Sequence, residues 1–130
     1  MIGCRVLVVE DDQDTREAIV DLLTAEGYDA EGARDGKHAL EILQKGDFRP
    51  DVIVLDLYMP TMNGHELRAA LQAESRWKHV PIVVCTGTLS APPEPGAFET
   101  LEKPIDVDAL LGVVRRGCAA RRAPDRAISA

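Results

Sequence analysis

The chain lacks the features that mark membrane and secreted proteins. Aromatic side chains make up only 4% of its 130 residues, beside 45% hydrophobic and 28% charged residues, which is ordinary for a soluble domain. No apolar run approaches the roughly 20 residues that a membrane-spanning helix needs. The first apolar run leads directly into acids and has no basic segment before it, so no secretory signal is predicted. We therefore expect a cytoplasmic protein with no membrane segment.

Cysteine is also scarce, with Cys4, Cys85 and Cys118 as its three occurrences. They are odd in number and form no CxxC motif, and two of them lie inside apolar runs. This pattern predicts buried thiols that pack as small apolar side chains.

Basic residues are few in most of the chain, whose net charge is −7. Residues 1–114 carry 21 acids and 10 bases, whereas residues 115–130 carry 5 bases and 1 acid. Nucleic-acid binding needs clustered Lys and Arg on the folded surface, so no nucleic-acid partner is expected. The length fits one compact domain, which we place at residues 1–118, followed by a basic, flexible tail at 119–130.

Apolar runs of strand length alternate with segments of helical periodicity, a pattern typical of an α/β protein with a parallel sheet. The second predicted strand is the least apolar and is therefore expected at an edge. We predict strands at residues 4–9, 28–33, 52–55, 82–85 and 98–101. We predict helices between Gln13 and Gly27, between Asp35 and Gly46, at about 65–74, and onward from a cap at Asp106.

Residues 91–96 interrupt the alternation where a fourth helix would be expected. Their sequence, APPEPG, places three prolines and a glycine in six positions. Proline removes a backbone donor and clashes with the preceding turn, so a regular helix cannot form there. We predict that the fourth helix is short or missing.

Acids, a hydroxyl and an ammonium group follow four of the predicted strands. Because the carboxyl ends of parallel strands meet at one edge, where ligands bind in open α/β sheets, these side chains should converge. They are Glu10, Asp11 and Asp12 after the first strand, Asp56 after the third, Thr86 and Gly87 after the fourth, and Lys103 after the fifth. Taken alone, each has an ordinary explanation as a helix start or a turn. The prediction depends on all four occurring in order.

Such a cluster has a chemical logic. Crowded carboxylates repel one another unless a cation lies between them, and Mg²⁺ prefers oxygen ligands, including one or two carboxylates and phosphate oxygens. A carboxylate beside this ion can attack an activated phosphoryl group and form an aspartyl-phosphate. Lys103 would neutralise charge on the phosphoryl oxygens, and Thr86 would donate a hydrogen bond to one of them.

Four segments of the chain resemble the receiver domain of two-component response regulators, the family that includes the chemotaxis response regulator. The likeness spans about residues 3–118 and rests on residues 5–12 (RVLVVEDD), 51–64 (DVIVLDLYMPTMNG), 81–87 (PIVVCTG) and 103–104 (KP). It implies a flavodoxin-like, doubly wound (βα)5 fold whose five parallel strands lie in the order 2-1-3-4-5.

The same resemblance implies the roles of single residues. Asp56 would be the phosphoacceptor, and Mg²⁺ or Mn²⁺ would be held by Glu10, Asp11, Asp56 and the backbone carbonyl of Tyr58. Thr86 resembles the switch hydroxyl, Gly87 the small residue that leaves room for the phosphoryl group, and Lys103 the ammonium that pairs with Asp56. The Lys103-Pro104 peptide is expected to be cis. Asp12 falls one position past the acid pair and is interpreted as a cap or a solvated first-turn acid of the first helix.

The chain also departs from the family pattern. The position of the switch aromatic is occupied by Thr100, and the spacing from Thr86 to Lys103 is short, so we expect a monomer or a weak dimer. Tyr58 and Thr88 flank the expected path of the attacking water. Our hypothesis is that the bulky Tyr58 slows hydrolysis of the phosphate.

The leading interpretation is a single-domain response regulator. It would take a phosphoryl group from a histidine kinase or phosphotransfer protein and then bind an unknown downstream protein, with no output domain after residue 118. It would not be a conventional enzyme, although its site would catalyse its own phosphorylation and dephosphorylation. The alternatives are an interaction module without phosphate turnover and a fragment of a hybrid histidine kinase. A magnesium-dependent phosphohydrolase is disfavoured, because its second acid would fall at Tyr58.

Overall fold

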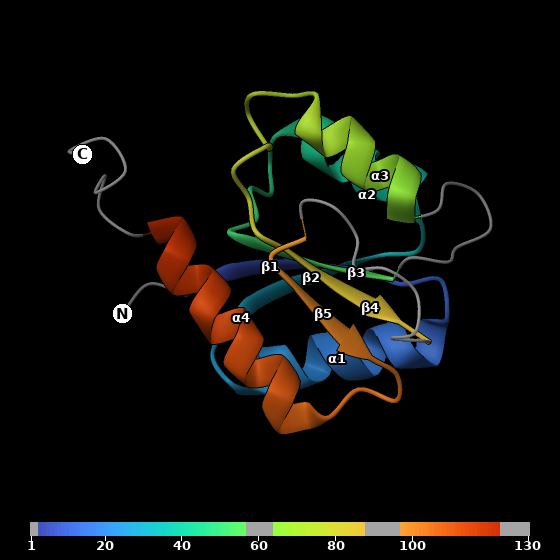
Figure 1. Cartoon of the computed structure of the whole chain (residues 1–130), viewed down its shortest axis with the longest axis vertical. Helices are drawn as coiled ribbons and strands as arrows, with labels where there is room; N and C mark the ends of the chain where they lie inside the picture. Colours follow the sequence, from blue (N-terminus) through green and yellow to red (C-terminus); the bar gives the residue numbers. More distant parts are fainter. Residues whose placement is uncertain (1–2, 57–63, 88–96, 123–130) are drawn as a thin grey trace.

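The computed structural model describes residues 3–56, 64–87 and 97–122 (Figure 1). Strands and helices alternate along most of these segments, within two residues of the predicted bounds. The strands are β1 (Arg5–Val9), β2 (Asp29–Ala33), β3 (Val52–Asp56), β4 (Ile82–Thr86) and β5 (Glu99–Glu102). The helices of the described segments are α1 (Gln13–Ala25), α2 (Gly36–Lys45), α3 (Gly64–Gln72) and α4 (Val107–Arg122).

The five strands form one parallel sheet in the order β2-β1-β3-β4-β5, as predicted. The central strands β3 and β4 are buried at every position, which explains why they appear in the sequence as unbroken apolar runs. At the two edges, β2 and β5 are only partly buried, and both contain polar residues. The prediction that the second strand lies at an edge is confirmed.

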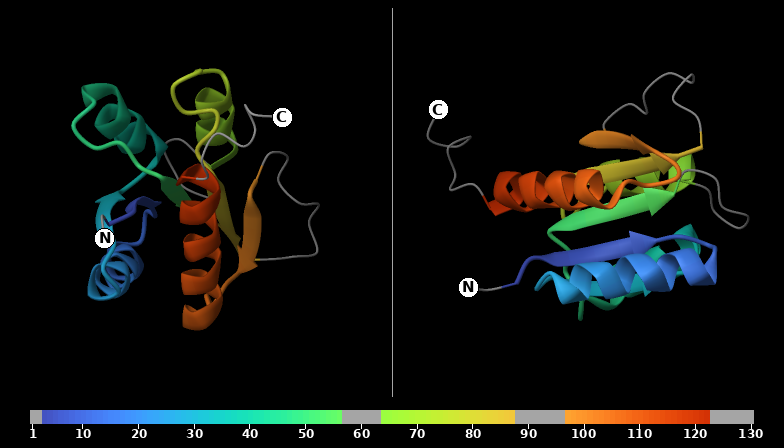
Figure 2. Two further views of the ribbon diagram at one scale, coloured as in Figure 1. Left: turned by 90° about the vertical axis from the view of Figure 1, so that its left-hand side faces the viewer. Right: turned by 90° about the horizontal axis from the view of Figure 1, so that it is seen from below.

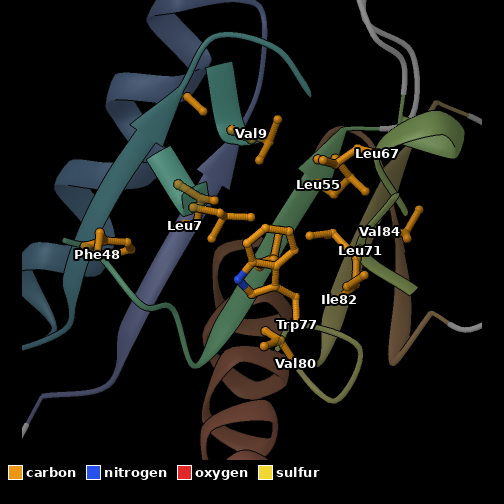
Figure 3. Close-up of a cluster of buried hydrophobic side chains, with 14 residues drawn as sticks. Leu7, Val9, Phe48, Leu55, Leu67, Leu71, Trp77, Val80, Ile82 and Val84 are labelled. Carbon is orange, nitrogen blue, oxygen red and sulfur yellow. The ribbon is translucent and has the colours of Figure 1, made fainter. Parts of the chain in front are cut away.

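Helices cover both faces of the sheet (Figures 1 and 2). Between the sheet and the α2 and α3 layer lies one cluster of buried side chains, with Trp77 among its members (Figure 3). A second cluster lies between the sheet and the α1 and α4 layer. The inward residues of these helices include Leu23, Ala39, Leu43, Leu67, Leu71, Leu110 and Val114.

Short polar side chains fix where the helices begin. Asp12 accepts a hydrogen bond from the backbone N–H of Thr15 at 2.9 Å, and Asp35 accepts one from that of His38 at 2.8 Å. These bonds satisfy donors that the first helical turn leaves without a partner. Gly46 ends α2 at φ 82°, a left-handed conformation that favours glycine. The structure thus places Asp12 as a cap, as predicted.

The cysteine prediction was wrong for two of the three residues. Cys4 and Cys118 form a disulfide with Cα atoms 6.1 Å apart, whereas Cys85 is a buried free thiol. The start of β1 and the end of α4 meet on one face of the sheet. Next to Cys118, a Cβ added to Gly117 would lie 3.0 Å from Val52, so the glycine permits this close packing. The pairing joins residues 114 positions apart, which is why no local pattern indicated it.

Two further predictions concern the second half of the chain. Helix α4 continues through residue 118 to Arg122, because the alanines and arginines at its end are strong helix formers. The expected short or missing fourth helix falls at residues 91–96, which lie outside the described residues. In the described segments, no helix combines the length and the apolar character needed to cross a membrane.

Candidate functional site

The parallel register brings the ends of β1, β3 and β4 to the same edge of the sheet. Val9 lies opposite Leu55, and Asp56 lies opposite Cys85. Glu10, Asp56 and Thr86 therefore meet at the carboxyl ends of these strands, as the sequence predicted. Their exposed fractions are only 4%, 6% and 4%. Among the described residues, these three are the buried polar or charged side chains. Burying two acids side by side is costly unless positive charge compensates them.

Lys103 supplies positive charge at this edge. Its Nζ lies 3.4 Å from Oδ1 of Asp56 and 3.2 Å from Oε1 of Glu10. The backbone N–H of Lys103 donates to the carbonyl of Thr86 at 2.7 Å, which fixes the residue directly beyond β5. The Lys103-Pro104 peptide is cis, as expected. Burial acts to lower the pKa of Lys103, but the charges of Glu10 and Asp56 outweigh it and raise that pKa, so the ammonium stays protonated.

Glu10 is the most strongly perturbed acid of the site. Burial raises its pKa to about 7, the backbone N–H of Asp12 opposes this shift, and the charge of Asp56 adds to it. That N–H donates to Oε2 of Glu10 at 3.2 Å. The positive charge of Lys103 lowers the pKa again, although by less than burial raises it. The site therefore holds a carboxyl group that can be neutral near pH 7 when no further cation is bound.

Glu10, Asp11 and Asp56 could together hold a metal ion. Each offers one carboxylate oxygen, and these three atoms lie within 4.8 Å of one another. Asp11 is exposed to solvent while the other two are buried, so an ion bound there could keep several water ligands. An all-oxygen ligand set of this kind fits Mg²⁺ or Mn²⁺.

Sequence reasoning missed Arg16, which lies in the first turns of α1. Its Nη1 donates to the backbone carbonyl of Glu10 at 2.9 Å and approaches that of Asp11 at 3.5 Å. A Cβ added to Gly32 of β2 would lie 3.0 Å from the side chain of Arg16, so this glycine leaves room for it. Arg16 thereby holds the backbone of the two adjacent acids. A single arginine in an amphipathic helix carries no local signal of such a role.

The acidic edge is the cluster of Glu10, Asp11 and Asp56 at the carboxyl ends of the strands. A mainly apolar cavity of about 470 Å³ adjoins it, between α1 and the start of α4. Glu10, Asp56 and Lys103 lie at its polar side, and Cys85 also lines it. Burial raises the pKa of the Cys85 thiol to about 12, with the positive charge of Lys103 opposing the shift. The thiol therefore stays protonated and is a poor nucleophile.

The remaining predicted residues are placed as follows. Gly87 is exposed, and a Cβ added there would meet no atom within 4 Å, so space is open beside Thr86. Thr100 lies in β5 opposite Val84 and is partly buried. Tyr58 and Thr88 lie outside the described residues.

Residues 6–115 match the family described as response regulator receiver domain. The chain belongs to this family. It is 33% identical over 125 residues to the transcriptional regulatory protein TcrA of Mycobacterium tuberculosis, covering 94% of this chain and 48% of that protein. It is 38% identical over 119 residues to the response regulator MprA of Mycobacterium ulcerans, covering 88% of this chain and 50% of that protein. The chain thus spans about half the length of these curated relatives.

Solved structures agree with this assignment. The signal receiver domain of a signal transduction histidine kinase from Syntrophus aciditrophicus matches with a TM-score of 0.84 and 27% identity, covering 95% of this receiver and 96% of that chain. The chemotaxis response regulator CheY4 of Vibrio cholerae matches with a TM-score of 0.79 and 34% identity, covering 88% and 98%. The flavodoxin-like fold is therefore that of a receiver of two-component signal transduction.

Proposed function

We propose that this receiver accepts a phosphoryl group on the carboxylate of Asp56. The observation that carries the proposal is the contact of Asp56 with Lys103, at 3.4 Å, beside two further acids at the end of a buried strand. A buried carboxylate needs such a cation, and the same cation can balance the charge of a bound phosphoryl group. The receiver family membership supports this role.

The donor would be a phosphohistidine on a histidine kinase or phosphotransfer protein. An oxygen of Asp56 attacks the phosphorus atom as the bond from phosphorus to the imidazole nitrogen breaks, and the electron pair of that bond stays on the imidazole. Lys103 offsets negative charge on the phosphoryl oxygens, and the hydroxyl of Thr86 donates a hydrogen bond to one of them. Positioning and charge supply most of the catalysis in such a transfer.

Glu10, Asp11 and Asp56 would hold the Mg²⁺ or Mn²⁺ ion, together with the carbonyl of Tyr58. When bound, the ion supplies positive charge that lowers the repulsion between the acceptor and the incoming phosphoryl group. Arg16 would act as a positioning residue, because its guanidinium holds the backbone carbonyl of Glu10. Water attack on the phosphorus of the aspartyl-phosphate would break its bond to the Asp56 oxygen and release inorganic phosphate, which would return Asp56 to a free carboxylate.

We further propose that the domain acts in the cytoplasm as a monomer or weak dimer. When phosphorylated, it would pass the signal to a downstream protein. Partly buried Thr100, at the position of the family's aromatic, keeps one alternative open: an interaction module that does not use phosphate.

Incubation with acetyl phosphate and Mg²⁺, followed by intact mass measurement, separates these two functions. The wild-type chain should gain the mass of one phosphoryl group, and chelation of the metal should prevent the gain. Asp56→Ala should gain nothing, whereas Asp21→Asn, a change on the outer side of α1, should behave as wild type. A gain that survives in Asp56→Ala would falsify the acceptor assignment, and no gain in any variant would favour the interaction module.

A further inference from the structure

A second pocket lies at the opposite edge of the sheet, before the starts of β3 and β4. Its volume is about 240 Å³, and it is lined by side chains from the loop after α2, the loop before β4 and the end of α4. The residues that matter here are Phe48, Arg49, Arg76, Trp77, Val80 and Arg121. It shares none of its lining with the acidic edge, because β3 runs between them for about 13 Å.

Three arginines line this pocket in a chain whose net charge is −7. Arg49, Arg76 and Arg121 come from three separate segments, and among the described residues no carboxylate lines the pocket. A nearby acid is Glu74, whose Oε1 is 3.9 Å from Nη2 of Arg76, and both side chains are more than half exposed. An exposed pair at this distance is weak, so it leaves the pocket positively charged.

Trp77 adds a hydrogen-bond donor to the residues that line the pocket. The residue is only 9% exposed. The guanidinium carbon of Arg76 lies over its ring, 4.5 Å from the ring centroid. Figure 3 shows the indole nitrogen on the side of the ring that faces Phe48, which also lines the pocket.

The indole N–H has no hydrogen-bond partner among the described residues. In contrast, every fully buried side-chain nitrogen of these residues has a partner. Nε1 of Trp77 therefore keeps some exposed surface, and Trp77 is one of the residues that line the pocket. A buried indole N–H normally finds an acceptor, and this one offers its hydrogen to whatever enters.

We propose that this pocket binds a small aromatic phosphate, with a single ring against the apolar wall and the phosphate between the arginines. Among the described residues, every polar side chain that lines the pocket is a donor, so the ligand must supply acceptors. Guanidinium groups bind phosphate through paired hydrogen bonds. An apolar cavity of about 150 Å³ can hold benzene, so 240 Å³ accommodates one ring with an acidic group and excludes a whole dinucleotide.

Trp77 is the sole tryptophan of the chain, so its fluorescence and its indole N–H resonance report on the pocket directly. The probe is phenyl phosphate, titrated into the full chain in the presence of a metal chelator, with inorganic phosphate and phenol as separate arms. We expect saturable quenching with phenyl phosphate and a shift of the indole N–H signal. Inorganic phosphate should bind at least tenfold more weakly, and phenol should not saturate.

Variants identify the groups that bind the probe. Arg49→Gln and Arg121→Gln should each weaken binding about tenfold, because each removes a charge-assisted contact. Trp77→Phe, measured by calorimetry, should weaken it several-fold while keeping an apolar wall. Arg115→Gln, an exposed change on α4 outside the pocket, is the matched control and should bind as wild type.

Three outcomes would overturn the proposal. They are no saturable response at millimolar phenyl phosphate, equal binding of inorganic phosphate, and equal loss in Arg115→Gln and the pocket variants. The folded state of each variant is checked by its amide spectrum, and a wild-type spectrum with unchanged affinity in Arg49→Gln and Arg121→Gln would also count against the site.

Discussion

The carboxyl ends and the amino ends of the strands carry side chains of opposite charge. At the carboxyl ends of the strands, Glu10, Asp11 and Asp56 share one ammonium, that of Lys103. At the amino ends, three arginines and Trp77 line one pocket, and no acid lines it in the described part of the chain. One parallel sheet thus has an acidic cluster at the carboxyl ends of its strands and, about 13 Å away, an arginine-lined pocket at their amino ends.

The two groups of residues differ in how far the sequence pattern predicts them. Residues of the acidic edge directly follow strands, so locating an apolar run also locates the side chain after it. The arginines of the second pocket come from two loops and a helix end. They come together only because α2 and α4 pack against the sheet. The local sequence pattern therefore predicts the acidic cluster, whereas the arginine-lined pocket can be recognised only in the folded structure.

The largest expected effect comes from Lys103→Gln, which removes the cation of the acidic edge. Phosphorylation of Asp56 by acetyl phosphate should slow by about 10²- to 10³-fold, as when one preorganised charge stabiliser is lost. The rate is measured by intact mass at fixed times. Lys45→Gln, an exposed change at the end of α2, is the control. A rate within threefold of wild type in Lys103→Gln would show that the ammonium plays no part in transfer.

The pH dependence of stability tests the crowding of acids at this edge. The pKa of Glu10 is about 7 in the folded chain and 4.5 as the ordinary value. Below pH 4.5 the group is protonated in both states, so folding loses nothing. Between pH 4.5 and 7 the unfolded chain has given up the proton that the folded chain retains, so the free energy of unfolding falls across this range and levels off above it.

Glu10→Gln isolates this contribution. Without metal, the stability of wild type should fall by about 1–3 kcal/mol relative to Glu10→Gln between pH 4.5 and 7.5, as denaturant unfolding measures. Added Mg²⁺ should stabilise wild type more at pH 8 than at pH 5, because the ligand must be deprotonated. Parallel stability curves for the two proteins would contradict the raised pKa.

A smaller effect is expected at Arg16, the residue that sequence reasoning missed. Arg16→Met removes the guanidinium that holds the carbonyl of Glu10 and should weaken Mg²⁺ binding about tenfold, as loss of a positioning partner does. Titration calorimetry measures the affinity. Arg34→Met, an exposed change after β2, is the control. If Mg²⁺ affinity were unchanged in Arg16→Met, the backbone contact would be structural only.

Much of the fold was predictable because each strand and helix carries its own signal. Buried β3 and β4 are unbroken apolar runs, and Asp35 and Gly46 mark both ends of α2. The long-range features were not predictable. The disulfide joins Cys4, directly before the first strand, to Cys118 in the last helix, so it depends on how α4 packs and not on spacing.

The candidate site shows the same division. Glu10, Asp56, Thr86 and Lys103 meet where the strand ends predicted, whereas Arg16 reaches the site only through the path of its side chain beside Gly32. The raised pKa of Glu10 also required the structure, because it depends on burial. The influence of Tyr58 on phosphate lifetime stays a prediction.

We propose Asp56 as the residue that takes the phosphoryl group, and chemical mapping of the modified residue tests this assignment. The chain is treated with acetyl phosphate and Mg²⁺, and borohydride then reduces the aspartyl-phosphate to homoserine, which marks the acceptor for peptide mass spectrometry. We predict homoserine at position 56 and none at positions 11 and 12. Homoserine at another acid, with Asp56 unchanged, would contradict the account.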